Sequence, residues 1–310
     1  MVAYELIRPD SPDLAQRGVD CLIAGPEGEQ RTQSFEARRR REFFRDYCRD
    51  NNLDLKCQRV ALANGQAVAA CLWVPNKGKT ALFYIPDLQR YPDAIPAVES
   101  CIRGALADSA AAGMALAQCL LETDDRPAIE VFHASGFSDL SILYYMEHGR
   151  PFFTPRPEFP PGVELQTYTP ARHEQFAAVI AASYIGTLDC PALSGLRRIE
   201  DVIAGHQAVG AFDPSLWLLA LRDGKPAGVL LMALHPQREC LEIVYLGLAP
   251  EARRQKLGTA LMQTALKTTV ERGATISTLA VDQNNTPALR LYQRLRYRKT
   301  GQRRALYKSL

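Results

Sequence analysis

The sequence repeats itself at an offset of about half its length. Glu5 in YELIRP matches Glu164 in VELQTY, an offset of 159 residues. The Asn-Gly pair in LANGQAVAACL matches the Asp-Gly pair in LRDGKPAGVLL at the same offset. Further along, RPAIEVFHASGF matches TPALRLYQRLRY at an offset of 160, so one inserted residue explains the shift. A repeat of this length predicts two copies of one domain in tandem within the 310 residues.

Both halves have the same order of predicted elements. Each half reads as an opening strand, a helical region, a hairpin at the Asn-Gly or Asp-Gly turn, a third strand, a helix, another strand, a last helix and a closing strand. In the second half we predict strands at 216–221, 227–234, 241–249 and 276–281, and helices at 257–272 and 286–295. This order predicts the α/β (α+β) class.

A proline-rich stretch separates the two halves. RPFFTPRPEFPPG, residues 150–162, contains five prolines, which disfavour helix and central-strand geometry around them. We therefore predict a first domain at 1–150, a linker at 151–162 and a second domain at 163–310.

The composition of the chain limits which binding partners and which cellular compartment we expect. Lys and Arg (37) nearly balance Asp and Glu (34), which argues against a general affinity for nucleic acid. The basic stretch 36–46 predicts a solvated helix, with a local patch for RNA or an acidic partner as the alternative. Eight scattered cysteines form no CxxC pair and no cluster with the five histidines, so we expect reduced thiols and no metal. The chain shows no leader and no run of about 18 apolar residues, which predicts a cytoplasmic protein without a membrane partner.

The stretch YLGLAPEARRQKLGTALM, residues 245–262, reads as a strand, a cationic loop and a helix. The first backbone N–H groups of a helix lack intrahelical partners, and the helix dipole adds positive potential there, so such a junction favours an anion. Arg253, Arg254 and Lys256 add full charges, and Gly258 allows close approach to the backbone. The pattern favours a phosphate or diphosphate ligand over a merely solvated charged surface.

Two motifs in this half resemble those of the GCN5-related N-acetyltransferases, the GNAT superfamily. Gln255, Gly258 and Ala260 fit the acyl-CoA signature Q/R-x-x-G-x-G/A. NTPALRLYQRLRY is similar to the pattern N-x-x-A-x-x-L-Y followed by Gly-Phe. The resemblance covers residues 163–310 and, through the repeat, implies two tandem GNAT-like domains, each with a mixed, mostly antiparallel central sheet flanked by helices.

The chain departs from the family motifs at three positions that usually hold glycine. Arg254 and Lys256 stand where many members carry glycine in the phosphate loop. Arg296 and Tyr297 replace the usual Gly-Phe after the second motif. The cations at 254 and 256 affect how the loop contacts a phosphate. The change at 296 and 297 affects only the conformation of the turn after the helix.

The resemblance implies a role for each motif residue. Tyr292 is the candidate general acid for the leaving thiolate of CoA, and Glu242 is the candidate general base for the amine, with a water chain as the alternative. The strand is expected to splay from its neighbour so that backbone groups of Leu246 and Leu248 bind pantetheine. The residues implied in binding acetyl-CoA are Leu246, Gly247, Leu248, Arg253, Arg254, Gln255, Lys256, Leu257, Gly258, Thr259, Ala260, Asn285 and Ala288.

The acceptor side is predicted from residues 183–207, where the family builds its substrate wall. Tyr184, Asp189 and Cys190 are the candidates there. Asp189 could hold an ammonium group or act as an alternative base, and it could equally start a turn before CPALSG. His206 and His235 have no evident partner and are expected to be structural. We expect a small-molecule or peptide amine as substrate, and a monomer or homodimer.

The first half lacks the anion-binding loop. At the offset of 160, Gln255–Ala260 fall on Ile95–Ser100, a segment with no cation and no glycine that contains a carboxylate. Tyr292 falls on Phe132, which keeps the ring and loses the hydroxyl. We therefore expect a degenerate first domain and a single acyl-CoA site, in the second domain.

The resemblance implies transfer of an acetyl or short acyl group from acetyl-CoA to a primary amine by direct attack. Two other functions stay open: a non-catalytic acyl-CoA-binding sensor or scaffold, and an aminoacyl-tRNA-dependent transferase, a role that tandem GNAT folds also serve. Retention of Tyr292 argues against the first alternative, and the intact phosphate loop argues against the second.

Overall fold

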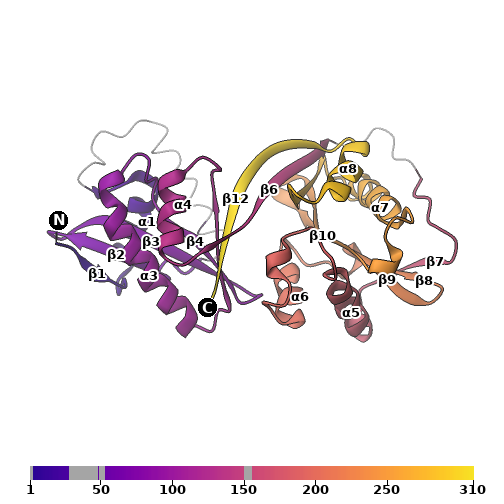
Figure 1. Cartoon of the computed structure of the whole chain (residues 1–310), viewed down its shortest axis with the longest axis horizontal. Helices are drawn as coiled ribbons and strands as arrows, with labels where there is room; N and C mark the ends of the chain where they lie inside the picture. Colours follow the sequence, from indigo (N-terminus) through magenta and orange to yellow (C-terminus); the bar gives the residue numbers. More distant parts are fainter. Residues whose placement is uncertain (1–2, 28–47, 49–52, 150–155) are drawn as a thin grey trace. The chain divides into compact units, whose positions relative to one another are not determined.

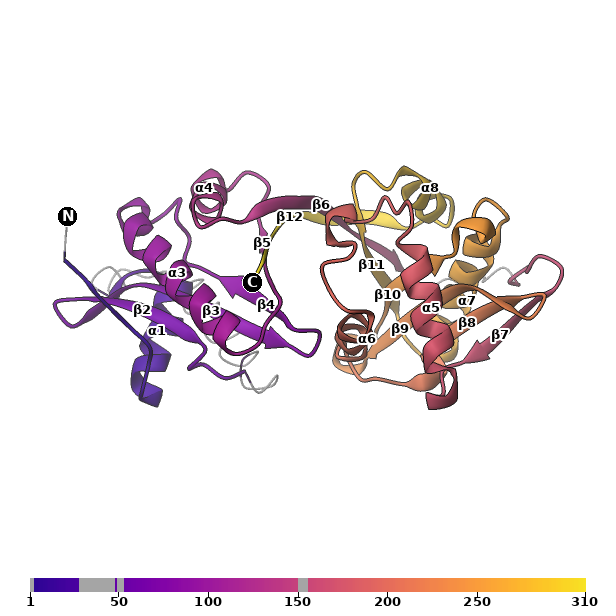
Figure 2. The same ribbon diagram turned by 60° about the horizontal axis from the view of Figure 1, so that its bottom comes forward.

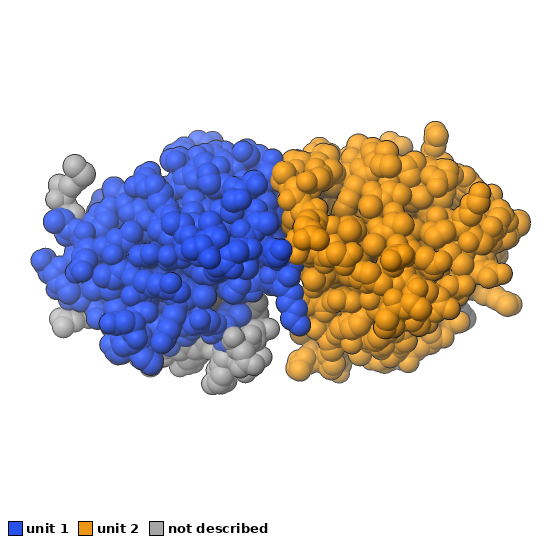
Figure 3. Space-filling view, turned by 90° about the horizontal axis from the view of Figure 1, so that it is seen from below, with its two compact units in different colours: residues 1–140, 304–310 blue, residues 141–303 orange. Residues whose placement is uncertain are grey.

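The computed structural model describes residues 3–27, 48, 53–149 and 156–310. Contacts divide the chain into two compact units, Met1–Leu140 with Arg304–Leu310, and Ser141–Arg303 (Figure 3). The basic stretch 36–46 and residues 151–155 of the predicted linker lie outside the described residues. None of the helices in the described ranges is long and apolar enough to cross a membrane.

The first unit has helices on both faces of a mixed sheet. Its strands follow the order β1, β2, β3, β4, β5 and the end of β12, with β4 parallel to β5 and the other pairs antiparallel. The first half of the chain contains β1 (Glu5–Ile7), α1 (Pro12–Ala24), β2 (Gln58–Ala63), β3 (Gln66–Asn76), β4 (Thr80–Tyr84), α3 (Ile95–Ala111), β5 (Leu116–Leu121), α4 (Arg126–Ala134) and β6 (Ser138–Gly149), most of which belongs to the second unit (Figure 1).

The second unit repeats this architecture. Its strands follow the order β6, β11, β10, β9, β8, β7, with β10 parallel to β11 and the other pairs antiparallel. The elements are β7 (Val163–Thr167), α5 (His173–Ser183), α6 (Ile199–Gln207), β8 (Trp217–Arg222), β9 (Lys225–His235), β10 (Cys240–Leu248), α7 (Leu257–Glu271), β11 (Ile276–Asp282), α8 (Thr286–Arg294) and β12 (Arg298–Ser309). The structure confirms the predicted α/β class.

Both predicted hairpins form, and their turns have the same conformation. Asn64 and Gly65 between β2 and β3 have φ values of 50° and 75°, and Asp223 and Gly224 between β8 and β9 have the same values. Positive φ at both central residues is the type I′ geometry that matches the twist of a two-residue hairpin, which explains the Asn-Gly and Asp-Gly pairs.

The repeat seen in the sequence is confirmed in the element bounds. β5 and β11 begin at residues 116 and 276, α4 and α8 at 126 and 286, and β6 and β12 at 138 and 298, an offset of 160 in each case. The helix caps repeat as well, because the side chains of Asp125 and Asn285 accept hydrogen bonds from the backbone N–H of Ala128 and Ala288. The two halves are therefore two copies of one fold.

Each closing strand pairs within the other half's unit. Residues 276–282 of β11 pair with 143–149 of β6, and residues 304–309 of β12 pair with 116–121 of β5. The compact units thus differ from the predicted domains, 1–150 and 163–310, at these strands. Alternating polarity predicts that a segment is a strand but not which strand it pairs with. The predicted domain boundaries stay a prediction.

The core of the second unit has two layers that enclose the sheet. Leu219 and Leu231 pack with Phe176 of α5 on one face, while Leu230 packs with Leu261 of α7 on the other. Figure 2 shows α5 and α7 on opposite faces of β8, β9 and β10. Because side chains alternate between the two faces of a strand, α7 packs on one face of the sheet. Residues of α8 belong to the same core cluster as those of α7.

Candidate active site

The strands β10 and β11 diverge in the middle of the second unit's sheet. They pair in parallel only from Cys240 to Ile243, opposite Ile276–Leu279. Beyond that point β10 follows β9 to Leu248, and β11 follows β6 to Asp282. A register shift in β10 lies between Ile243 and Tyr245, where the divergence begins. The predicted splay is present, and it leaves one backbone edge of β10 without a partner strand in this part of the described sheet.

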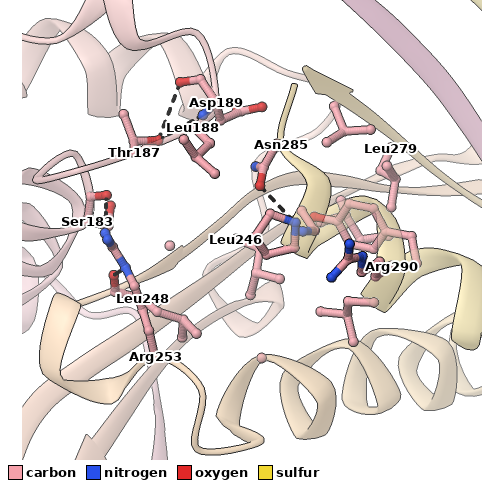
Figure 4. A pocket seen from close by; sticks show the side chains of 18 of the residues that line it. Ser183, Thr187, Leu188, Asp189, Leu246, Leu248, Arg253, Leu279, Asn285 and Arg290 are labelled. Atoms are coloured by element: carbon pink, nitrogen blue, oxygen red, sulfur yellow. Dashed lines mark hydrogen bonds between the residues drawn. The ribbon is translucent and has the colours of Figure 1, made fainter. Parts of the chain in front are cut away.

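A cavity of about 1070 Å³ opens at this divergence (Figure 4). Its walls come from the loop after α5, the end of β10, the start of α7, the end of β11 and one side of α8. The predicted residues that line it are Leu246, Gly247, Leu248, Arg253, Arg254, Lys256, Gly258, Thr259, Asn285, Ala288, Tyr292 and Asp189. The structure therefore brings together most of the residues that the two motifs single out.

Three residues predicted to bind acetyl-CoA lie outside the cavity wall. Leu257 and Ala260 are buried on the side of α7 that packs against the sheet. The Gln255 side chain is exposed and donates a hydrogen bond to the carbonyl of Glu251. Only one side of the first turn of α7 faces the cavity. Gly258 and Thr259 therefore line it, while Leu257 and Ala260 do not.

Gly247 is required by packing against α5. A Cβ at this position would lie 2.6 Å from the Tyr245 ring and 2.8 Å from the Ser183 hydroxyl oxygen. These two side chains also hydrogen-bond to each other, with 2.7 Å between their hydroxyl oxygens. The glycine thus lets the end of α5 close over β10 beside the cavity.

The loop between β10 and α7 contains two residues in the left-handed conformation. Arg254 has φ 60° and Lys256 has φ 65°, at the two positions where many GNAT members carry glycine. A residue with a Cβ is strained there, whereas glycine is not. The chain therefore keeps the backbone path of a glycine-rich loop while placing two cations on it, which supports a role in binding an anion.

Arg296 presents the same strain away from the cavity, with φ 66°, and its repeat equivalent is Gly136 with φ 87°. Arg296→Gly is expected to raise the free energy of unfolding by about 1 kcal/mol, because the relief of left-handed strain exceeds the entropy that glycine adds to the unfolded chain. Urea denaturation measures this difference. Arg298→Gly is the matched control, since Arg298 is exposed in the extended strand β12, where glycine is neutral or destabilising. Equal stabilisation in both variants would assign the gain to lost charge and contradict the role of φ.

Arg253 is held by the backbone around it. Its guanidinium donates hydrogen bonds to the carbonyls of Ser183 at 2.9 Å, Leu248 at 3.3 Å and Gly186 at 3.4 Å. These bonds tie the loop after α5 to the end of β10. Arg253 therefore shapes the cavity, with its donors committed to protein carbonyls, in contrast to Arg254 and Lys256.

Tyr292 stands on α8 and is one of the residues that line the cavity. The residue is 7% exposed, and its ring lies 6.0 Å from the ring of Tyr297. Burial, with the nearby Asp189 carboxylate and Tyr297, raises the pKa of the Tyr292 hydroxyl well above its usual range. The phenol is therefore protonated at neutral pH and able to donate a proton to a group in the cavity.

Asp189 and Asp282 cross-link the acceptor wall to the end of β11. The Asp189 carboxylate accepts a hydrogen bond from the backbone N–H of Asp282 at 3.0 Å, and the Asp282 carboxylate accepts one from the N–H of Cys190, also at 3.0 Å. A further hydrogen bond from the Asn285 side chain reaches Asp189. Burial raises the pKa of the Asp189 carboxyl despite these bonds. Asp189 therefore both lines the cavity and fixes its wall.

Glu242 lies outside the cavity wall and is paired with a histidine. Nε2 of His235 lies 2.8 Å from the Glu242 carboxylate, a partner that was not evident from the sequence, and the structural role of His235 stays a prediction. The two residues are cross-strand neighbours at the joined ends of β9 and β10, where Cys240 faces His235. The connection of four residues after His235 is the sequence signal that could have predicted this pair.

Tyr184 lies in a second hollow of about 240 Å³, between α5 and α6, which it lines with Arg197. It packs against Tyr245, a residue of the cavity wall, with 6.2 Å between the ring centroids. His206 stacks on the other side of Tyr245 at 5.1 Å, and burial lowers its pKa to about 4, so its ring is neutral. Tyr184 and His206 therefore both pack against Tyr245, which lines the cavity.

The equivalent junction in the first unit is closed. Val98 of α3, which matches Gly258 at the offset of 160, is fully buried in the core of the first unit. Phe132, which matches Tyr292, is also fully buried and packs against Phe137 at 4.9 Å. A side chain thus occupies the place where the second unit has its glycine.

Arg290 and Arg294 line the cavity and were missed by sequence reasoning. Arg290 carries its guanidinium on the side of α8 that faces the cavity (Figure 4). Both residues follow Pro287, which also lines the cavity, at spacings of three and seven, and such positions lie on one side of a helix. Among the residues that the structure describes, no group of three His, Cys, Asp or Glu side chains could hold a metal ion.

Comparisons with known proteins agree with this geometry. Residues 186–297 match the Acetyltransferase (GNAT) family. This range includes both motifs and nearly all of the cavity wall, so the chain carries a GNAT acetyltransferase domain.

Two solved structures share the fold over the whole chain. A GCN5-related N-acetyltransferase from Sphaerobacter thermophilus has a TM-score of 0.62 at 19% identity and covers 99% of this chain and 95% of its own. A tandem GNAT protein from the clavulanic acid biosynthesis pathway has a TM-score of 0.54 at 15% identity, with 99% and 98% covered. Both share the fold of nearly the whole chain, and the second is described as a tandem GNAT protein.

Curated relatives match the chain over part of their length. Mycothiol acetyltransferase of Thermomonospora curvata is 34% identical over 175 residues, which are 56% of this chain and 57% of the relative. Mycothiol acetyltransferase of Thermobispora bispora is 34% identical over 169 residues, 52% of this chain and 56% of the relative. The chain thus matches little more than half of each of these relatives.

Proposed function

We propose that the protein is an N-acetyltransferase that moves an acetyl or short acyl group from acetyl-CoA to a primary amine, at one site in the second unit. The observation that carries this proposal is the cavity between the diverging strands, whose wall includes Gly258, the cationic loop and Tyr292. The unpartnered edge of β10 at Leu246 and Leu248 fits the amide groups of pantetheine, and the first turn of α7 fits the diphosphate.

The chemistry needs two proton transfers. The amine nitrogen attacks the thioester carbonyl, a C–N bond forms, the C–S bond breaks and the sulfur leaves with the electron pair. The Tyr292 hydroxyl gives its proton to that sulfur. Burial raises the pKa of the Tyr292 hydroxyl above its usual range, so the hydroxyl holds its proton until the thiolate forms.

The proton of the amine goes to a base, for which the chain offers two carboxylates. Glu242 is the base that the resemblance implies, and because it lies outside the cavity wall it acts through a water molecule. Asp189 is the alternative, since it lines the cavity and its pKa is raised toward the working range by burial. The relatives named mycothiol acetyltransferase support a small-molecule amine as the acceptor.

One observation favours a second function, a non-catalytic acyl-CoA-binding protein. Glu242 forms a pair with His235 and does not line the cavity, so direct removal of the amine proton falls to a water molecule or to Asp189. The two functions share the CoA site and differ only in turnover.

Calorimetric titration with acetyl-CoA, followed by a free-thiol assay with a panel of amines, tests the proposal. We expect one site per chain and release of CoA thiol that depends on the amine. Two sites would contradict the closed junction at Val98, and binding without turnover on any amine would favour the non-catalytic function. In the thiol assay, Glu242→Gln and Asp189→Asn identify the base, whose loss is expected to lower kcat by about 10²-fold or more.

A further inference from the structure

Four cations line the cavity without an ion pair of their own. The side chains of Arg254, Lys256, Arg290 and Arg294 make no hydrogen bond or ion pair to any residue within the described ranges. Arg290 and Arg294 are also one helical turn apart on α8, a spacing at which like charges destabilise a helix. Unpaired like charges around one cavity indicate an anionic ligand with several charges.

Packing places the α8 arginines beside the phosphate loop. A Cβ on Gly258, in the first turn of α7, would lie 3.6 Å from Cδ2 of Leu291. Arg290 and Arg294 flank Leu291 on α8, one residue before it and three residues after it, and both line the same cavity. The N-terminus of α7 and the two arginines therefore face a common space.

The repeat shows that these arginines accompany the anion site. At the offset of 160, Arg290 and Arg294 fall on Glu130 and Ala134 of α4. The helix is kept in the first unit, with matching bounds, but neither cation is. The pair is therefore absent from the unit that lacks the anion-binding loop, which supports a role in binding the ligand of the second unit.

The number of cations exceeds what a diphosphate needs. The N–H groups at the start of α7, with Arg254 and Lys256 on the loop, suffice for two negative charges. CoA carries a further phosphate monoester on its ribose, with a charge of about −1.5 to −2 at pH 7. A guanidinium binds such a group through paired hydrogen bonds.

We propose that Arg290 and Arg294 bind the 3′-phosphate of CoA and so select a nucleotide-bearing thioester as the acyl donor. A thioester on a carrier protein shares the pantetheine arm but lacks the 3′-phosphate, and the cavity discriminates against it. This proposal rests on the proposed function, because it assumes that the cavity takes CoA.

Calorimetric titration of the full chain with CoA and with 3′-dephospho-CoA tests the proposal. We expect the unaltered protein to bind CoA about tenfold more tightly than dephospho-CoA. The double variant Arg290→Ala/Arg294→Ala is expected to bind both ligands equally, at the affinity that the unaltered protein shows for dephospho-CoA. The matched control is Arg238→Ala/Arg298→Ala, which removes two exposed charges of the same unit outside the cavity wall and should keep the tenfold preference.

The outcomes separate the two proposals. Loss of the preference in the Arg290/Arg294 variant alone supports the assignment. Equal weakening of both ligands in that variant, or an unaltered protein without any preference, overturns it while leaving CoA as the donor. Failure of the unaltered protein to bind either ligand overturns the proposed function itself. The single variants Arg290→Ala and Arg294→Ala give the same readout should the double variant fold poorly.

Discussion

Gly258→Glu is expected to abolish the binding of acetyl-CoA. Gly258 lies in the first turn of α7, where the unpaired N–H groups and the helix dipole attract an anion, and a carboxylate there repels the diphosphate at close range. The backbone accepts a side chain, because a Cβ at this position meets only Leu248 at 3.4 Å and Leu291 at 3.6 Å, which are ordinary contacts. Calorimetric titration measures the loss, and the thermal transition checks that the variant folds.

Two control variants separate charge from bulk. Gly258→Ala is expected to keep binding with at most about a tenfold loss, since the methyl group fits without displacing its neighbours. Gly258→Gln has the size of glutamate without its charge and should retain weak, measurable binding. Equal and complete loss with Gln and Glu would assign the effect to bulk and contradict the electrostatic role of the loop.

The same titration tests for a site in the first unit. Val98, the equivalent of Gly258, is fully buried, so a charged substitution there would disturb the core and reveal nothing about binding. The stoichiometry of Gly258→Glu avoids this difficulty. A second site in the first unit would leave one bound acetyl-CoA per chain in the variant, whereas a single site leaves none.

The local elements of the fold could be predicted because their signals are local. The helix expected at 257–272 is observed at Leu257–Glu271, and the hairpins form at the Asn-Gly and Asp-Gly pairs. Turn residues and apolar periodicity act over a few residues and do not depend on the rest of the chain. The repeat then extended these assignments to both halves.

Pairing between distant segments could not be predicted in the same way. The sequence of β12 shows a strand, but its partnership with β5 is set by the geometry of both sheets. The three carbonyl partners of Arg253 were missed for the same reason. Each of these contacts depends on which side of a helix, strand or loop faces its neighbour. A cluster of cations in the sequence does not predict the direction in which each side chain points.

Tyr292→Phe is expected to lower kcat by about 10²-fold to 10⁴-fold, the usual contribution of a positioned general acid. The dissociation constant for acetyl-CoA is expected to change by less than about twofold, because the ring remains in place. The fold itself supports this expectation, since Phe132 occupies the equivalent position in the first unit and is fully buried there. Steady-state kinetics and calorimetry on the same preparation measure the two quantities.

Tyr297→Phe is the matched control for loss of a buried phenol. Its hydroxyl and the Ser277 hydroxyl lie 2.8 Å apart, and the ring lies 6.0 Å from that of Tyr292. Removing this hydroxyl is expected to cost about 1 kcal/mol of stability through the lost hydrogen bond, with kcat unchanged. A similar fall of kcat in both variants would indicate a packing effect rather than a lost proton donor.

The pH dependence of kcat gives a second, independent test of Tyr292. A general acid must carry its proton, so activity falls as the pH rises through its pKa. Burial raises that pKa above the ordinary tyrosine value of about 10, so kcat should hold on the alkaline side up to at least pH 10. In Tyr292→Phe the residual activity should show no such tyrosine-dependent fall at higher pH. A variant that keeps full turnover, or that loses affinity for acetyl-CoA together with turnover, would make Tyr292 a structural residue of α8 and leave protonation of the thiolate to water.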